Sequence, residues 1–230
     1  MLDEYFVEKH TKIHQWIPDL VFPLLPDDPN IAIAEQRLWE PQLACFLKKN
    51  IGKEILLYFG EAQPRRGYDT LLKLTCEEKF CFIHCGLSSY PEKYEVDIRE
   101  LKNYLDSQSL LFETNAFIQC YQTMQLFFNA CKYVVLPYRR HFGSSGVMLQ
   151  AVHFGKPVLV SNQGLMAART QQHHLGLTYY HDDYEDLKEQ LKILKETSNE
   201  FSNDLVRYKQ IFSPQKVMEI LDTVLNRVVE

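Results

Sequence analysis

The sequence has 230 residues, 46% of them hydrophobic, which is enough to bury the core of one large domain. The formal net charge of -5 and the pI of about 5.9 argue against a broad nucleic-acid-binding surface, so no nucleic-acid partner is expected. No apolar run has the ~20 residues that a membrane-spanning helix needs, and the charged segment MLDEYFVEKH is not typical of a signal peptide.

The six cysteines include no C-x-x-C pair, and most of them lie in apolar segments. This pattern predicts reduced, buried thiols in a cytoplasmic protein. Cys76, Cys81 and Cys85 have strand-like neighbours and no second pair that could complete a zinc site. We therefore expect no metal site and no cofactor.

Residues 1–50 have an irregular pattern. The segment IPDLVFPLLPDDPN contains four prolines, which disfavour long helices and strands. A helix is predicted from about Ile31 to Lys49, and Pro41 is expected to kink it or to end it. We assign residues 1–50 to an N-terminal extension and entry segment.

Beyond residue 50, short apolar runs alternate with amphipathic segments. The runs predicted as strands are 54–60, 79–86, 109–115, 132–138, 156–161 and 176–181. The segments predicted as helices are 67–78, 94–107, 120–131, 144–155, 183–197 and 213–230, the last with Ser213 as N-cap. Apolar strands separated by helices predict a doubly wound parallel sheet, an α/β fold of the Rossmann-like type. The predicted domain covers residues 51–212, and a separate C-terminal helix covers 213–230.

The loop after the fourth predicted strand has the composition of an anion site. Ligands of such sheets bind beyond the carboxyl ends of the strands, and the N–H groups at a helix N-terminus favour phosphate. The loop opens a helix and contains cations, small residues and hydroxyls: Arg139, Arg140, His141, Gly143, Ser144, Ser145 and Gly146. Ordinary helix capping by serine and glycine remains the alternative interpretation.

The loop after the first predicted strand is also cationic. Arg65 and Arg66 lie just before a second helix start, and an arginine can bind phosphate oxygens through two parallel hydrogen bonds. A solvated surface pair is the alternative. Because both loops lie at one edge of the predicted sheet, together they favour an anionic ligand.

Three segments resemble the donor-binding, C-terminal half of the GT-B glycosyltransferases of group 1, a family of retaining enzymes. They are ILLYFGEAQPRRGYDTLLKL, NACKYVVLPYRRHFGSSGVMLQAVHFGKPVLVSNQG and LGLTYYHDDYEDLKEQL, and the resemblance covers residues 55–191. The GKPV piece is the most specific of these motifs. The resemblance implies a two-domain enzyme of which this chain is one half.

The resemblance also implies roles for individual residues. Arg66 matches the family's diphosphate-binding lysine and is the predicted catalytic residue. The amides of the SSGV segment would bind the diphosphate, and Phe117 would stack on the nucleobase. The full set of predicted substrate-binding residues is Gly60, Glu61, Arg65, Phe117, Arg139, Gly143, Ser144, Ser145, Gly146, Val147 and Gln150. Gly164 and Leu165 match a loop that faces the sugar.

The chain departs from the family pattern at three positions. Glu61 stands where the family has a diphosphate-binding arginine, and Arg65, Arg139 or Arg140 could compensate. Gln150 stands where a glutamate usually binds the ribose hydroxyls, and its amide can still donate and accept. The family's other glutamate falls at Phe142 or His141. A subset of the family carries an SSGV-type loop, and this chain is closest to that subset.

We therefore predict a hexosyltransferase-type domain that binds a UDP-, GDP- or ADP-sugar. The sugar would pass to an acceptor hydroxyl with retention, in polysaccharide biosynthesis. The fifty residues before the domain are too few for a second Rossmann-like fold, so we expect the N-terminal acceptor domain to be missing and the isolated domain to be inactive. Any peripheral membrane contact would be made through that missing domain.

Three other interpretations remain open. A catalytically inactive glycosyltransferase-like interaction domain would explain Glu61 and the lost glutamates. A sugar-nucleotide epimerase shares the two-domain architecture, but its catalytic carboxylates and histidine cannot be placed in this sequence. The third is a flavodoxin- or receiver-like domain; a receiver would need an acidic cluster at the strand ends, and the sequence has none there.

Overall fold

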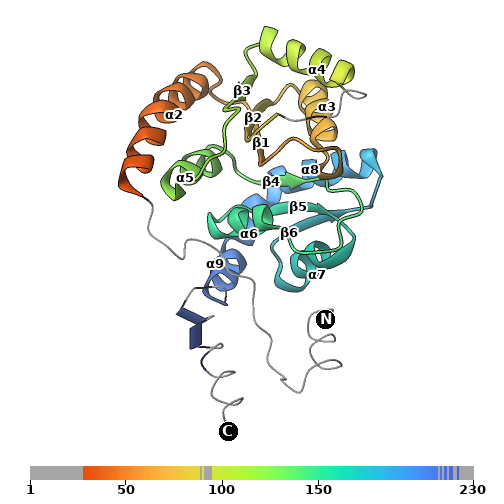
Figure 1. Ribbon diagram of the computed structural model, residues 1–230. Coiled ribbons are helices and arrows are strands. Elements are labelled where there is room, and N and C mark those ends of the chain that lie inside the picture. The colour runs from red at the N-terminus through yellow and green to blue at the C-terminus, as the bar shows by residue number, and fades with distance from the viewer. Residues whose placement is uncertain are drawn as a thin grey trace.

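The computed structural model describes residues 28–88, 90, 95–211, 213, 215–216, 218–219 and 222. The predictions for residues 1–27 and for most of the terminal helix 213–230 fall outside this part of the chain. Within it, strands and helices alternate as predicted, and the α/β fold is confirmed (Figure 1). The predicted domain boundaries stay predictions.

The first half of the domain contains one parallel sheet. Its strands, in spatial order, are β1 (Ile55–Phe59), β2 (Cys81–Cys85) and β3 (Leu111–Glu113). All five side chains of β2 are buried, as expected for a strand covered on both faces.

Four helices cover this sheet. α3 (Tyr68–Glu78) and α4 (Glu95–Ser107) contact each other on one side, and α2 (Pro29–Lys49) and α5 (Tyr121–Ala130) contact each other on the other side (Figure 1). The connections explain this arrangement. A right-handed crossover places α3 and α4 on one face, and the chain must change face when it runs from β3 back past β1.

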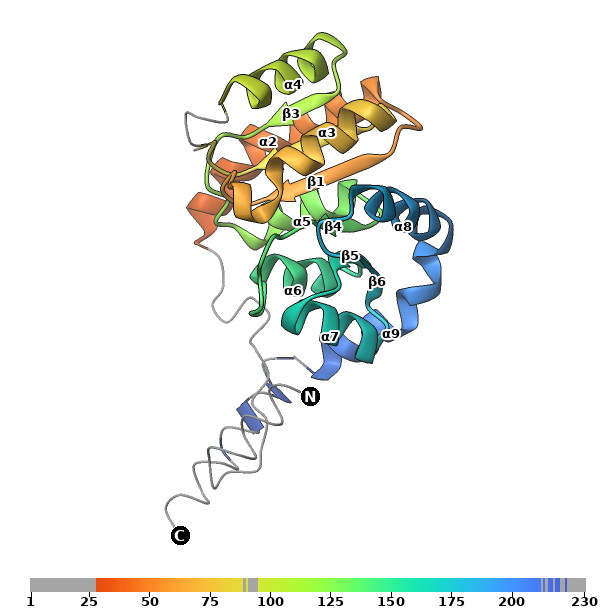
Figure 2. The same cartoon turned by 90° about the vertical axis from the view of Figure 1, so that its right-hand side faces the viewer.

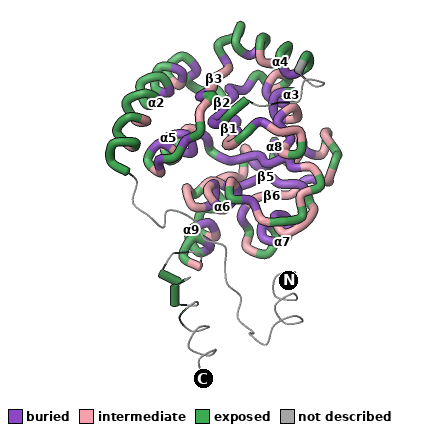
Figure 3. Tube along the Cα trace, in the orientation of Figure 1, coloured by how far each residue is buried: buried purple, intermediate pink, exposed green. Residues whose placement is uncertain are grey.

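The second half repeats the pattern with a second parallel sheet. Its strands, in order, are β4 (Val134–Leu136), β5 (Val158–Ser161) and β6 (Gly176–Tyr179). The side chains of β4 and β5 are buried throughout. In Figure 3 the buried chain follows the strands, whereas much of α2 and α4 is exposed.

The helices of the second half are α6 (Gly146–His153), α7 (Gly164–His173), α8 (Tyr184–Thr197), the short η3 (Ser198–Phe201) and α9 (Ser202–Ile211). The last of these contacts α6. Neither α7 nor α9 is predicted from the sequence. The expected sugar-facing loop at Gly164 and Leu165 is the first turn of α7.

The two sheets meet where β1 lies next to β4, so the strand order across the domain is 3-2-1-4-5-6 (Figure 2). The predicted doubly wound sheet is therefore present, but its halves pair as two separate three-stranded sheets. Polar contacts join them at both ends. Glu54 accepts hydrogen bonds from Lys132 Nζ and Tyr133 Oη, each at 3.2 Å. At the other end, Arg139 N donates to Arg65 O at 2.8 Å.

Gly67 permits this close approach. Its φ of 68° lies in the left-handed region that glycine adopts without strain. A side chain at this position would overlap the carbonyl oxygen of Pro137, which follows β4. The glycine therefore allows the loops after β1 and β4 to touch.

The helix predicted at residues 31–49 begins at Pro29, with Asp28 accepting from Asn30 N at 2.8 Å. It continues through Pro41 to Lys49, so the prediction that Pro41 might end it is wrong. Apolar packing outweighs the hydrogen bond that proline removes. Trp39 and Phe46 both bury against Phe112 of β3, with ring centroids 6.5 and 5.6 Å apart.

A buried polar network closes the carboxyl end of the first sheet. His84 of β2 is fully buried, with Nδ1 3.1 Å from Glu113 Oε1 and Nε2 3.1 Å from the carbonyl oxygen of Gly60. Glu113 also pairs with Lys102 Nζ at 2.8 Å and accepts from Tyr68 Oη at 3.3 Å. Burial alone would raise the pKa of Glu113, but the hydrogen bonds from His84 and Lys102 outweigh it and lower the pKa to about 2.

The lowered pKa of Glu113 predicts a pH-dependent contribution to stability. The contribution is complete above the ordinary pKa of 4.5 and is lost as the pH falls toward 2. Glu113→Gln should lower the free energy of unfolding by about 2 kcal/mol at neutral pH, and this difference should shrink as the pH drops through that window. Urea unfolding at neutral and acidic pH measures it. Glu100→Gln, on an exposed position of α4, serves as the control. If the difference in unfolding free energy between Glu113→Gln and the wild type stayed constant down to pH 2, the lowered pKa of Glu113 would be contradicted.

Candidate functional site

A cleft of about 950 Å³ opens at the carboxyl ends of the strands, where the two sheets meet. This is the point at which the strand order changes direction, and open α/β sheets bind their ligands there. The cleft walls come from the loop after β1, the loop between β3 and α5, and the loop that opens α6.

The loop after β1 contributes Gly60, Arg65 and Arg66 to the cleft. Tyr58 holds its backbone, because Tyr58 Oη donates to Glu61 O at 2.9 Å and accepts from Gln63 N at 3.3 Å. The short helix η1 (Pro64–Arg66) contains both arginines and leads through Gly67 into α3.

Arg66 lies tightly against the β1 loop. A Cβ added at Gly60 would be 2.5 Å from Arg66 Nη1, so a side chain at this position would displace the guanidinium. Arg66 Nε is buried and has no hydrogen-bond acceptor among the described residues. A buried donor on a cation favours an anionic ligand, because burial without an acceptor costs free energy.

The N-terminus of α6 forms the opposite wall. Ser145 is its N-cap, and its Oγ accepts from Met148 N at 3.3 Å. Gly146 and Val147 follow in the first turn, where backbone N–H groups have no partner within the helix and carry partial positive charge. These residues and Ser144 all line the cleft.

The far end of the cleft is more apolar. It is lined by Phe117, Ile118, Tyr121, Met124 and Gln150. Phe117 is 70% exposed, so its ring is available to a ligand. The side chain of Gln150 donates only to Met124 Sδ, at 3.6 Å, and its buried Oε1 has no partner among the described residues. The end therefore offers an aromatic ring and one buried amide oxygen.

His153 supports this end from behind. Burial lowers the pKa of His153 to about 4, so the ring is neutral at physiological pH. Its Nε2 lies 2.7 Å from Tyr121 Oη, within hydrogen-bond distance. This contact orients Tyr121 in the cleft wall.

The structure brings nine of the twelve sequence-predicted site residues together in this cleft: Gly60, Arg65, Arg66, Phe117, Ser144, Ser145, Gly146, Val147 and Gln150. The other three lie outside its lining. Glu61 is exposed, and its Oε2 accepts from Gln63 Nε2 at 2.6 Å. Gly143 is exposed on the loop before Ser144. Arg139 points to another surface.

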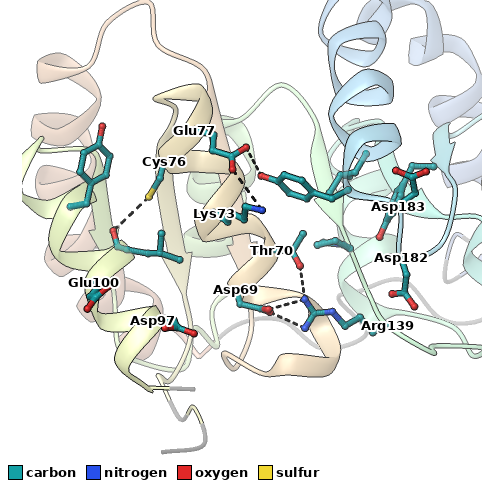
Figure 4. Close-up of a pocket in the computed structure, with 16 residues that line it drawn as sticks. Asp69, Thr70, Lys73, Cys76, Glu77, Asp97, Glu100, Arg139, Asp182 and Asp183 are labelled. Carbon is teal, nitrogen blue, oxygen red and sulfur yellow. Dashed lines mark hydrogen bonds and ion pairs between the residues drawn. The ribbon is translucent and has the colours of Figure 1, made fainter. Parts of the chain in front are cut away.

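Arg139 lies in a second groove, of about 810 Å³, between α3, α4 and α8 (Figure 4). Its guanidinium forms two hydrogen bonds to Asp69, at 2.7 and 3.1 Å, and also contacts Thr70 Oγ1 and Pro64 O. These contacts occupy the guanidinium of Arg139 outside the cleft, and its predicted contact with substrate stays a prediction. Its role is to join the second sheet to α3.

A further contact crosses the same groove. Tyr184 Oη, at the start of α8, donates to Glu77 Oε2 of α3 at 2.9 Å. Lys188 Nζ lies 3.4 Å from the same carboxylate oxygen. The groove therefore adds polar contacts between the two halves of the domain to those of Glu54 and of the loop backbones.

Sequence reasoning missed other residues of the cleft, including Ile31, Ile118, Tyr121, Met124 and Tyr138. Most are apolar or aromatic residues that also fit a core pattern, so no local signal separates them. Among the described residues, no group of three or more His, Cys, Asp or Glu side chains is placed to hold a metal ion. No helix in the described part of the chain combines the length and apolarity that crossing a membrane requires.

The sequence matches one protein family, described as "Glycosyl transferases group 1", over residues 45–211. No curated protein sequence matches the chain. Solved structures share the fold at low identity. Sucrose-phosphate synthase from Thermosynechococcus elongatus superposes with a TM-score of 0.64 at 15% identity, over 98% of this chain and 56% of that one.

Two other structural relatives were solved with nucleotides. Anabaena HepE in complex with UDP and glucose gives a TM-score of 0.56 at 15% identity, over 97% of this chain and 59% of that one. An E. coli structure described as trehalose-6-phosphate bound with UDP-2-fluoro glucose gives 0.56 at 13% identity, over 90% of this chain and 51% of that one. The chain thus spans little more than half the length of these relatives, and at such identities the likeness shows the fold alone.

Replacing Arg66 and replacing Arg139 should have different effects, the first on anion affinity and the second on stability. Arg66→Met should weaken the binding of inorganic pyrophosphate at least about tenfold, because it removes charged hydrogen-bond donors from the cleft. Arg139→Met should leave that affinity within about twofold and instead lower the free energy of unfolding by about 1 kcal/mol, since its ion pair with Asp69 is partly exposed. Titration calorimetry and urea unfolding measure the two effects. Equal losses of affinity in both variants would refute this division.

Proposed function

The chain belongs to the group 1 glycosyl transferases, and we propose that it is the donor-binding domain of a retaining, hexosyltransferase-type enzyme that uses a nucleotide-sugar. The observation that carries the proposal is the pairing of Arg66 with the N-terminus of α6 across one cleft. A diphosphate has the charge and the size to contact both walls at once.

The cleft suggests how a donor would lie. The diphosphate would contact Arg66 and the amides of Gly146 and Val147. The nucleobase would occupy the apolar end beside Phe117, where a ring can stack. Gln150 would accept a ribose hydroxyl through its buried Oε1. The UDP-containing relatives support a donor of this class.

The proposed chemistry breaks the bond between the anomeric carbon and the diphosphate oxygen, whose electron pair leaves with the diphosphate. The acceptor hydroxyl oxygen forms the new bond to the anomeric carbon on the same face, and its proton passes to the departing diphosphate oxygen. The residues of this chain act on the leaving group. Arg66 and the α6 amides face the place where negative charge grows, which is where fixed dipoles stabilise a transition state most.

The acceptor side of the proposal lies elsewhere. The relatives are nearly twice as long as the stretch that this chain matches, which supports an additional acceptor-binding domain as partner. The isolated domain would then bind the donor without transferring sugar. Polysaccharide biosynthesis is the proposed setting.

One set of observations favours a second function, an inactive domain used for protein interaction. Glu61 replaces a cation of the family pattern, and Gln150 replaces a carboxylate. Neither change closes the cleft. Glu61 lies outside its lining, and Gln150 lies in the lining with a buried Oε1 that has no partner among the described residues. Binding of a nucleotide separates the two functions.

We expect the domain to bind one of UDP, GDP and ADP with a submillimolar dissociation constant in titration calorimetry. The affinity should come largely from the diphosphate, so the matching nucleoside should bind much more weakly. Arg66→Met is the matched control and should abolish measurable binding. Absence of binding for all three nucleotides at millimolar concentration would sink the donor-site proposal and leave the interaction domain.

A further inference from the structure

Arg169 lies behind the loop that opens α6. It comes from α7, and only 6% of its surface is exposed. Its Nη1 donates to Ser144 Oγ at 2.9 Å. Arg169 does not line the cleft, whereas Ser144 does. A buried guanidinium thus contacts a residue of the cleft wall through a serine hydroxyl.

Ser144 is held at two atoms. Arg169 binds its side-chain oxygen, and His141 Nε2 lies 3.0 Å from its carbonyl oxygen. Arginine has only donors, so Ser144 Oγ must be the acceptor in its contact with Arg169. The hydroxyl hydrogen of Ser144 is therefore left to donate to another group.

The neighbouring serine has a different role. Ser145 Oγ accepts from Met148 N as the N-cap of α6, and only 6% of the residue is exposed. Ser144 is partly buried and borders the cleft. Of the two serines, Ser144 is the less buried, and it is the one whose hydroxyl Arg169 contacts.

The helix that carries Arg169 is fixed to the same loop. Leu165 N, in the first turn of α7, donates to Phe142 O at 3.0 Å. Arg169 follows one turn later, on the same helix. The loop and the guanidinium therefore keep their relative positions without help from a ligand, which reduces the ordering cost of binding.

We propose that Arg169 is a positioning residue for the donor diphosphate, which it serves by making Ser144 donate its hydroxyl hydrogen into the cleft. A charge-assisted hydrogen bond polarises the hydroxyl, and this strengthens its donation to an anion. The inference rests on the proposed function, because it assumes that the anion at the α6 N-terminus is a diphosphate.

The test is a double-mutant cycle read by the affinity for inorganic pyrophosphate, which needs no knowledge of the base. Arg169→Met and Ser144→Ala should each weaken binding about tenfold, and the double variant should lose little more than either single one. Arg169→Lys keeps the charge and should recover part of the loss. Arg207→Met removes an exposed arginine of α9, paired with Asp204, and is the control that should bind like the wild type.

Each result has a clear meaning. If the affinity losses of the two single variants multiply in the double variant, Arg169 acts through the structure or through its charge and not through the Ser144 hydroxyl. That result would overturn the proposal. Full affinity in Ser144→Ala would overturn it as well, even where Arg169→Met fails to fold. Failure of the wild type to bind both pyrophosphate and the three nucleotides would instead refute the proposed function itself.

Discussion

The contact between the loops that follow β1 and β4 is the constraint on which the rest of the structure depends. It is made by one backbone hydrogen bond, from Arg139 N to Arg65 O, and by the absence of a side chain at Gly67. Because the loops touch there, a cation from the first sheet and a helix N-terminus from the second face one cleft. Neither half of the domain has both parts of an anion site.

Three arginines near this contact differ in what they bind rather than in charge. Arg139 uses its donors on Asp69, Thr70 and Pro64, so it stabilises the fold. Arg169, behind the loop that opens α6, donates to Ser144 of that loop. Arg66 keeps a buried donor with no acceptor among the described residues. A cation is suited to ligand binding only where the protein has not already neutralised it, and that depends on tertiary contacts.

Much of this arrangement could be predicted from the sequence. Continuous apolar runs define the strands, and the Ser/Gly-rich start of α6 shows where a helix N-terminus meets the sheet edge. Other features depend on contacts between distant residues. The helix continues through Pro41 because it packs against Phe112, which lies far along the chain. The guanidinium of Arg139 points away from the cleft because it pairs with Asp69. α7 lacks a strong apolar period, so the sequence does not predict this helix. The contact of Arg169 with the α6 loop is not predicted for the same reason.

The pairing of the strands as two separate sheets has a thermodynamic consequence. No continuous backbone ladder crosses from β1 to β4, so the halves are joined there by side chains and loop contacts. We expect partial opening of the domain core to cost least free energy at such a boundary. A ligand that binds Arg66 of the first half and the N-terminus of α6 of the second half acts as a non-covalent cross-link between the two halves. Binding of a ligand in the cleft and resistance of the domain to partial opening are therefore thermodynamically linked.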